Sequence, residues 1–243
     1  NILYYYNIIY IYHHKMKNKL LLLFLTISIL SLSAQNDAVY ENWSSIDVDY
    51  SINKNIDIYA SGQLRIKSVG DTYNKSFIEI GSKFKINKNL ESGIGYREID
   101  QLDDTGSQQS HQKSERYHGF VQGTVDIKEF QVRLRLQFQR EEEKELAGWE
   151  LFKKDFIRTR IELKYDIKDW KADPRIGIEF FTKDNLNFDE NYKKYRFSFG
   201  TKLKLKGPNS LTIKYILQEE VRVDSPVSHH ILRLNYNYSI KRK

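Results

Sequence analysis

The chain of 243 residues contains no cysteine and only three prolines. The absence of cysteine excludes disulfide bonds, cysteine-ligated metal sites and the lipid anchor of a bacterial lipoprotein. An exported chain without these supports must be held together by its own architecture.

Long apolar runs are equally scarce, and the mean hydropathy of −0.62 does not fit a bundle of membrane helices. One apolar stretch, residues 20–30, follows the basic segment 16–19 and precedes the small residues 31–34. This layout is typical of a secretory signal peptide cleaved near Ala34, because the stretch is too short to span a bilayer comfortably. A retained membrane anchor is the alternative.

Methionine occurs once, at Met16, where that basic segment begins. We therefore expect residues 1–15 to be translated leader, residues 16–34 to be the signal peptide, and residues 35–243 to form a single domain. Residues 1–34 contain three lysines and no acidic residue, so the formal net charge of +7 becomes +4 for residues 35–243. A surplus this small does not call for nucleic acid as a partner.

Apolar and polar residues alternate one by one through most of the chain from Tyr40 to Ile240. Residues 130–138 (FQVRLRLQF) show this best, with apolar residues at even positions and polar or cationic residues at odd positions. A β-strand with this period has one apolar face and one polar face. Eleven such strands are expected, over residues 40–52, 56–67, 76–86, 90–102, 116–127, 130–140, 155–167, 172–181, 195–205, 211–223 and 230–240.

The connections between these strands alternate between short and long. The repeated triplets at residues 53–55 and 87–89, both Asn-Lys-Asn, predict tight turns, whereas the polar stretches 103–114 and 141–154 predict longer loops. This alternation is typical of an all-β, antiparallel up-and-down transmembrane β-barrel in the bacterial outer membrane, surrounded by membrane lipid. A soluble β-sandwich or a lipocalin-like barrel is the alternative, because alternation alone does not say which face points outward.

Ten to twelve strands are expected, and twelve is preferred because bacterial single-chain barrels usually have an even number. A further short strand near residues 37–41 would complete that number. Aromatic residues close to strand ends are expected to form a girdle at the membrane interfaces. They are Trp43, Trp170, Tyr165, Tyr236 and Tyr238.

The polar faces carry more charge than solubility requires. In a barrel, neighbouring strands would place these side chains next to one another, so that Glu162 and Glu179 could bridge arginines of adjoining strands. Such a network would either pack the interior closed or line a narrow pore for small anionic solutes. The charged residues expected in the interior are Arg65, Glu79, Arg97, Arg116, Arg133, Arg135, Arg158, Arg160, Glu162, Arg175, Glu179, Arg196 and Arg233.

Signs of catalysis or of a bound cofactor are weak. A lipid-hydrolysing barrel needs a serine activated by a histidine, and His230 lies on an apolar face, but no serine segment beside it has the expected motif. His229 and His230 are adjacent in a strand and point to opposite faces, so they are poorly placed to share a metal ion. No glycine loop for phosphate is present. We expect no cofactor, no metal and no enzymatic activity.

Three functions remain open at this point. The first is a structural or passive-permeation role with an Arg/Glu-lined lumen. The second is surface binding or adhesion through the loops 103–114 and 141–154, the latter including the charge run 141–145, which we expect to be a solvated outer loop. The third is a lipid-active enzyme that uses His230.

Several short motifs resemble one known family. They are Arg116-Tyr117, Arg133-Leu134-Arg135 with Gln137, Arg158-Thr159-Arg160-Ile161-Glu162, Gly95-Tyr96, Tyr195-Arg196-Phe197, and Trp43 near the start of the strands. Together they are similar to the exported Bacteroidota-type proteins known as domain of unknown function 2490, over roughly residues 43–238. The resemblance implies an outer-membrane barrel and brings no known activity or catalytic residues.

Overall fold

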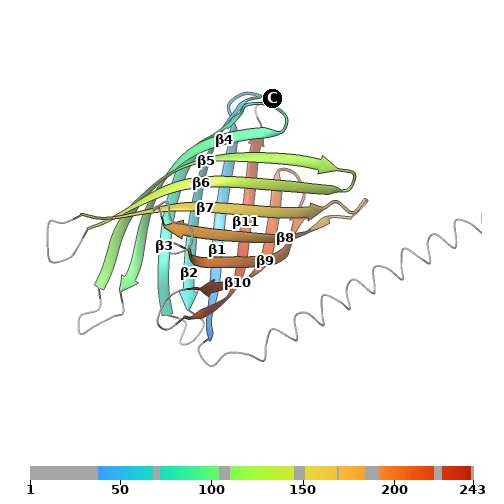
Figure 1. Cartoon of the computed structure of the whole chain (residues 1–243). Coiled ribbons are helices and arrows are strands. Elements are labelled where there is room, and N and C mark those ends of the chain that lie inside the picture. Colours follow the sequence, from blue (N-terminus) through green and yellow to red (C-terminus); the bar gives the residue numbers. More distant parts are fainter. Residues whose placement is uncertain are drawn as a thin grey trace, which may run out of the picture. The chain divides into compact units, whose positions relative to one another are not determined.

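The computed structural model of the chain describes residues 38–67, 72–103, 110–144, 151–168, 170–183, 192–221 and 226–241. These residues form one closed barrel of eleven β-strands (Figure 1). The expected leader and signal peptide lie outside the described residues. The strands are β1 (Ala38–Ser51), β2 (Ile56–Lys67), β3 (Thr72–Lys85), β4 (Leu90–Asp103), β5 (Ser110–Ile127), β6 (Phe130–Lys144), β7 (Leu151–Tyr165), β8 (Ala172–Lys183), β9 (Tyr192–Lys204), β10 (Asn209–Glu220) and β11 (Ser228–Lys241).

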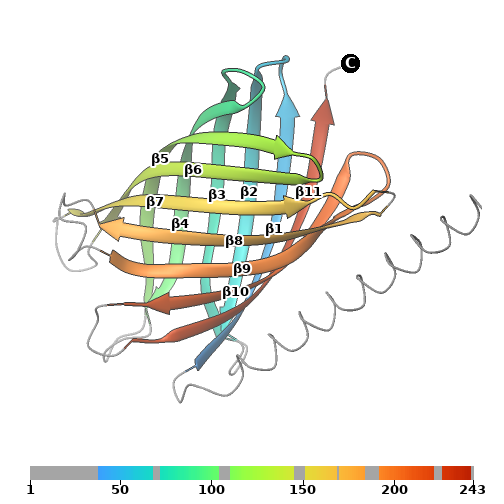
Figure 2. The same cartoon turned by 45° about the vertical axis from the view of Figure 1, so that its right-hand side comes forward.

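Each strand pairs antiparallel with its neighbours in sequence, and β5 to β9 run across the wall that faces β1 to β3 (Figure 2). The all-β barrel is thus confirmed, and eleven described strands fall within the predicted ten to twelve, one fewer than the preferred twelve. The expectation of a wholly antiparallel barrel is wrong at the closing pair. Because the number is odd, β1 and β11 meet in parallel, from Ala38 opposite Ser228 to Ser51 opposite Lys241.

The additional strand expected near residues 37–41 does not exist as a separate element in the described part of the chain. Residues 38–41 are the first four residues of β1, and they continue its register with β11 without interruption. Polar side chains hold this parallel seam together inside the barrel. Asn235 Nδ2 donates to Asp47 Oδ2 at 2.6 Å, and Asn237 Nδ2 donates to Asp49 Oδ2 at 2.7 Å.

The two Asn-Lys-Asn triplets form identical turns, as predicted. Asn53 Oδ1 accepts hydrogen bonds from the backbone nitrogens of Asn55 and Ile56 at 2.8 and 2.9 Å. Asn87 Oδ1 does the same for Asn89 and Leu90, again at 2.8 and 2.9 Å. In both turns the amide side chain replaces a backbone acceptor and so fixes the reversal of the chain.

The connections divide between the two ends of the barrel. We call the end where β1, β3, β5, β7, β9 and β11 finish the turn end. We call the end where these strands begin the loop end. The side chains considered below are placed along the barrel by their distance from these ends.

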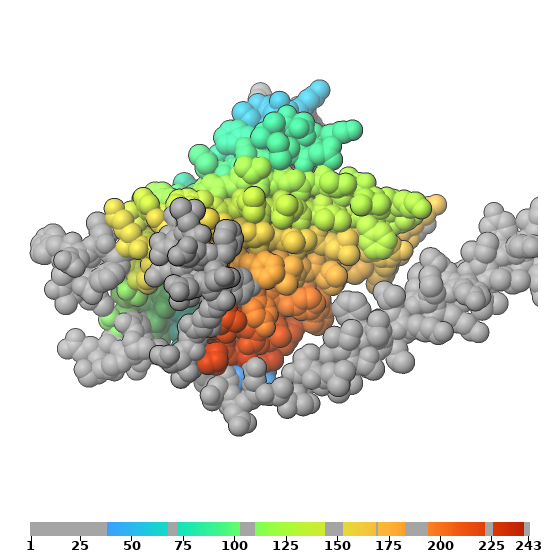
Figure 3. Space-filling view, viewed as in Figure 1, coloured from blue at the N-terminus to red at the C-terminus, as the bar shows by residue number. Residues whose placement is uncertain are grey.

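The outer face of the barrel carries the large apolar side chains. Ile78 is 68% exposed, Ile46 61% and Ile94 60%, and exposed apolar residues follow at alternate positions in β1, β5, β6 and β11. The side chains of β5 to β9 close into a continuous wall (Figure 3). The polar residues of the same strands point inward, so this barrel reverses the arrangement of an ordinary soluble protein.

The described residues contain no helix of the length and apolar character that would cross a membrane.

The expectation that Trp43 belongs to an interfacial girdle is wrong. Trp43 is only 4% exposed and points into the barrel, because it occupies an odd position of β1, whose outward residues Ile46, Val48 and Tyr50 are at even positions. Its Nε1 donates to Glu41 Oε2 at 2.7 Å. Trp170, by contrast, is 55% exposed.

Two glycines give a matched test of close packing in the wall. A Cβ on Gly200 would lie 2.7 Å from Lys214 Cα, which is backbone and has no room to move, whereas a Cβ on Gly62 would have nothing within 4 Å. We expect Gly200→Ala to lower the free energy of unfolding by about 1–3 kcal/mol. Gly62→Ala should leave it unchanged or raise it by up to about 1 kcal/mol. Urea unfolding of the two variants, followed by tryptophan fluorescence, measures the difference, and equal stabilities would contradict this packing.

Candidate functional site: the charged barrel interior

The barrel interior collects the charged side chains of the strands. Alternation along each strand places every second residue inside, and closure of the sheet brings these residues from different strands together. All thirteen charged residues predicted for the interior lie there: twelve line internal cavities, and Glu179 is bonded to arginines that do. The twelve are Arg65, Glu79, Arg97, Arg116, Arg133, Arg135, Arg158, Arg160, Glu162, Arg175, Arg196 and Arg233.

Glu179 on β8 is the carboxylate with the most arginine partners. Arg158 on β7 donates to it through Nε at 2.5 Å and Nη2 at 2.9 Å, and Arg160 Nε on the same strand lies at 2.7 Å. Arg196 on β9 approaches from the other side, with Nη1 at 3.5 Å. Glu179 is only 7% exposed, so one buried carboxylate joins three consecutive strands.

Glu162 on β7 forms a second centre. Lys214 Nζ lies 2.7 Å from its Oε2, while Arg175 Nη1 and Arg133 Nη1 lie 3.3 and 3.5 Å from its Oε1. Arg133 and Arg175 come from the neighbouring strands β6 and β8. Lys214 belongs to β10, which does not pair with β7, so this contact crosses the interior rather than following the sheet.

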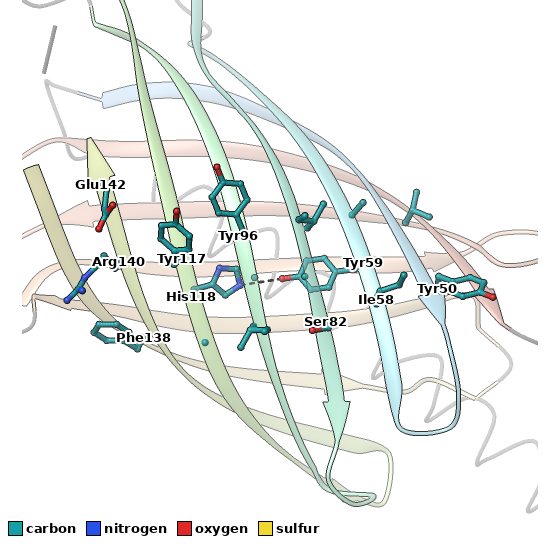
Figure 4. A pocket seen from close by; sticks show the side chains of 17 residues that line it. Tyr50, Ile58, Tyr59, Ser82, Tyr96, Tyr117, His118, Phe138, Arg140 and Glu142 are labelled. Atoms are coloured by element: carbon teal, nitrogen blue, oxygen red, sulfur yellow. Dashed lines mark hydrogen bonds between the residues drawn. The ribbon is translucent and has the colours of Figure 1, made fainter. Parts of the chain in front are cut away.

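Glu79 on β3 anchors a third group at a place where small residues line the wall. It pairs with Arg97 of β4 and accepts a hydrogen bond from Tyr59 Oη at 3.0 Å. Figure 4 shows Tyr59 and His118 pointing toward one another, with Tyr59 Oη 3.3 Å from His118 Nε2. Two strands, β3 and β4, lie between them; β4 contributes Gly95, and a Cβ there would lie 2.6 Å from Tyr59 Oη. The glycine therefore allows this contact across the strands.

Arg116 has an acidic partner that the sequence interpretation placed in a loop. It pairs with Glu141, which is 8% exposed and also accepts a hydrogen bond from Ser114 Oγ at 3.3 Å. The expectation that residues 141–145 form a solvated outer loop is wrong for residues 141–144, because β6 extends to Lys144. The inward alternation of β6 continues to Glu141 and Glu143, and Glu143 binds Lys154 at 2.7 Å.

The predicted loop 103–114 is shorter than expected for the same reason. β4 ends at Asp103 and β5 begins at Ser110, so residues 110–114 belong to a strand. At the other predicted loop, β7 begins at Leu151 and takes up residues 151–154. The remaining residues, 104–109 and 145–150, lie outside the described part of the chain. Surface binding through these loops stays a prediction.

Two of the cavities that the described residues line lie in the interior, and both are rich in cations. The larger, of about 530 Å³, is lined by twelve lysines and arginines but only five aspartates and glutamates. The smaller, of about 240 Å³, has six cationic and two acidic residues in its lining. Asp47, Arg135, Arg160 and Arg233 line both cavities and so stand between them. We call these four residues the partition.

The paired histidines lie on opposite faces of β11. His229 points inward, where its Nδ1 is 2.8 Å from Glu41 Oε1. His230 points outward, with Nδ1 2.5 Å from Tyr215 Oη and its ring stacked on Tyr40 at a centroid distance of 5.1 Å. The described hydrogen bonds of His230 thus involve tyrosine rather than serine. Lipid hydrolysis through His230 stays a prediction that this arrangement does not favour.

The sequence interpretation overlooked the lysines of the barrel interior. Lys75, Lys194 and Lys214 line the cavities but were not among the predicted residues. The signal was present, since each occupies a position on the polar face of its strand. Arginine stood out because it gathers mid-strand, whereas Lys75 and Lys194 lie near the loop end.

Comparison with known proteins agrees with the resemblance noted in the sequence. Residues 40–225 match the family described as Protein of unknown function (DUF2490). No curated protein matches the chain.

Proposed function

Because the chain belongs to the DUF2490 family, whose description assigns no activity, we propose from the barrel itself that it is an outer-membrane β-barrel with a passive-permeation role. Its cationic interior would admit small anions. The observation that carries the proposal is the reversal of faces, with large apolar side chains outside and charges inside.

The outer surface supports a membrane as the surroundings of this barrel. Thirty large hydrophobic residues are exposed in the described part of the chain, and water would make such a surface prone to aggregation. Lipid would solvate it. A tilted strand needs about 9–11 residues to cross a bilayer, and the strands of 12 to 18 residues exceed that length. A closed barrel also leaves no backbone edge exposed to hydrocarbon.

The expected signal peptide together with the barrel supports the outer membrane as the location. An exported bacterial chain with a lipid-facing β-barrel has its place there, with the shorter turns toward the periplasm and the longer connections toward the outside. A hollow in the outer wall also supports lipid as the surroundings of the barrel. It measures about 1170 Å³ and is lined by apolar residues such as Ile58, Ile80, Ile94 and Phe138, and lipid chains would fill it (Figure 4).

The interior supports small anions as the solutes. Positive residues exceed negative ones in both cavities. Arginine side chains arranged around a pore attract anions and repel cations. The partition has three arginines and one aspartate, so an ion that moves between the cavities passes a net positive constriction. This geometry favours weak anion selectivity over a fully sealed interior.

Conductance in a planar lipid bilayer tests the proposal. We expect the purified chain to give unitary current steps with a preference for chloride over potassium. The double variant Arg135→Gln/Arg233→Gln should bring that preference close to unity, because it removes two of the three cations of the partition. Arg140→Gln is the control, since Arg140 faces outward and binds Asp155 at 2.7 Å.

Two results would contradict the proposal. One is a chain that inserts into the bilayer, as judged by a heat-dependent shift in gel mobility, but carries no current. The other is a selectivity that Arg140→Gln reduces as much as the partition variant does, because the effect would then come from overall charge.

A further inference from the structure

In the larger cavity Arg65 has a neutral hydrogen-bond partner rather than a carboxylate, and Arg196 has a neutral partner in addition to Glu179. Arg65 Nε donates to Gln63 Oε1 at 2.8 Å, and Arg196 Nε donates to Gln218 Oε1 at 2.8 Å. Both glutamines are buried. An amide oxygen orients a guanidinium group without neutralising its charge. Arg65 is therefore fixed in place with its charge not neutralised. Arg196 shares the single charge of Glu179 with Arg158 and Arg160, so it too can attract an anion.

Aromatic rings add to this positioning. The guanidinium carbon of Arg65 lies 3.8 Å from the centroid of the Trp43 ring, and that of Arg196 lies 5.1 Å from the same ring. Arg196 also lies 4.6 Å from the Phe181 ring. A guanidinium group that rests on an aromatic ring keeps the N–H groups of its edge available to a ligand. Trp43 thus carries two arginines whose edges can point into the cavity.

Two lysines complete the cluster. Lys75 on β3 and Lys194 on β9 line the same cavity, and among the described residues neither has a carboxylate within 4.0 Å, although Glu141 and Glu143 attract Lys75 from farther away. Lys75 is the fourth residue of β3 and Lys194 the third residue of β9, and both strands start at the loop end. Lys194 Nζ lies 5.2 Å from the centroid of the Phe181 ring, on which Arg196 also rests, and both lysines line the cavity together with Arg65 and Arg196.

The neighbouring carboxylates Glu41 and Glu141 are bonded to groups outside the cluster, and Glu179 divides its charge between Arg196 and two arginines outside it. Glu41 binds Trp43 Nε1 at 2.7 Å and His229 Nδ1 at 2.8 Å, and it also accepts from Asn74 Nδ2 at 3.2 Å. Glu141 pairs with Arg116, and Glu179 shares its two oxygens among three arginines. The cations of the cluster consequently outnumber the negative charge available to them.

We propose that Arg65, Lys75, Lys194 and Arg196 form a binding site for a multivalent small oxyanion, a solute with two or more carboxylate or phosphate groups. Four neighbouring cations match several negative charges on one ligand better than a single chloride ion. Guanidinium edges fit the paired oxygens of carboxylate and phosphate. The cavity of about 530 Å³ has the size of a small-molecule site.

This inference rests on the proposed function and deepens it, because it names the class of solute. Lys75 and Lys194 near the loop end would receive the anion first, and Arg65 and Arg196 on the Trp43 ring would hold it. The partition lies farther along the interior and takes no part in this binding.

Isothermal titration of the purified full chain in detergent micelles, with pyrophosphate and with citrate at about 0.15 M sodium chloride, tests the site. We expect saturable binding of at least one of the two. Lys75→Gln/Lys194→Gln should weaken it about tenfold or more, since it removes two charge-assisted contacts. The control Lys153→Gln/Lys204→Gln changes the net charge equally, but its lysines line neither cavity, and binding should stay within about twofold.

The site would be overturned if neither pyrophosphate nor citrate bound, or if the two double variants weakened binding equally. Gel mobility with and without heating verifies that each variant is folded. The outcomes also separate this inference from the proposed function. A barrel that conducts chloride but binds neither probe loses the site and keeps permeation, whereas a barrel that binds a probe without conducting keeps the site and loses permeation.

Discussion

Replacing Glu179 with glutamine is expected to lower the free energy of unfolding by about 3–5 kcal/mol, the cost of leaving buried charges without their partner. Glu179 accepts from Arg158, Arg160 and Arg196 at distances of 2.5 to 3.5 Å and is 7% exposed. Glutamine has the same shape but no charge. Three guanidinium groups in an interior that already has excess positive charge would then lose their shared counter-ion.

Urea unfolding of the barrel in lipid vesicles, followed by tryptophan fluorescence, measures this effect. Glu142→Gln is the matched control, because Glu142 is on the outer face and its described ion pair is with Lys153 at 3.7 Å. Exposed pairs of this kind contribute about 0–1 kcal/mol. If Glu179→Gln were as stable as Glu142→Gln, the buried ion centre would not contribute to folding as described.

If the barrel lies in a membrane, an arginine at the middle of the outer face should lower the free energy of unfolding nearly as much as Glu179→Gln does. Ile78 is near the centre of β3 and is 68% exposed. Lipid-facing arginine at the bilayer midplane costs about 2–4 kcal/mol in barrels of this kind. We therefore expect Ile78→Arg to reduce stability in lipid vesicles by that amount.

Ile86→Arg provides the comparison, because Ile86 is of the same residue type and is 58% exposed but follows the end of β3 at the turn end. There the cost should fall to about 0–1 kcal/mol. A soluble barrel would show no such dependence on the position along the strand. In water, replacing an exposed isoleucine with arginine changes the free energy of unfolding little at either position. Equal stabilities of the two variants would thus contradict the membrane location.

Much of the fold follows from local pattern. Alternation along 130–138 is enough to separate the inner from the outer face of β6, and the Asn-Lys-Asn triplets mark their turns because the asparagine side chain makes the turn hydrogen bonds itself. The inner position of the arginines follows from the same alternation. The bridging of neighbouring strands by Glu179 follows as well, because antiparallel pairing sets Arg160 and Arg196 opposite it.

Other features depend on information that no single segment contains. The run of acidic residues at 141–143 has the composition of a loop, but the pairing of β6 with β5 and β7 extends the strands through it. Tryptophan is a residue type that is common at membrane interfaces, yet the register of β1 turns the Trp43 side chain inward. The contact of Lys214 with Glu162 crosses the interior, so only the closed barrel determines it. The parallel seam arises from the total number of strands.

That seam also limits how this chain can be rearranged. Because β1 and β11 run in the same direction, the start of β1 at Ala38 and the end of β11 at Lys241 lie at opposite ends of the barrel. In a barrel with an even number of strands the two termini are adjacent, and a short linker can join them to make a circular permutant. Here a linker would have to travel the length of a 14-residue strand, about 45 Å, through the charged interior or along the apolar outer wall. The order of the strands is therefore fixed by the closure itself.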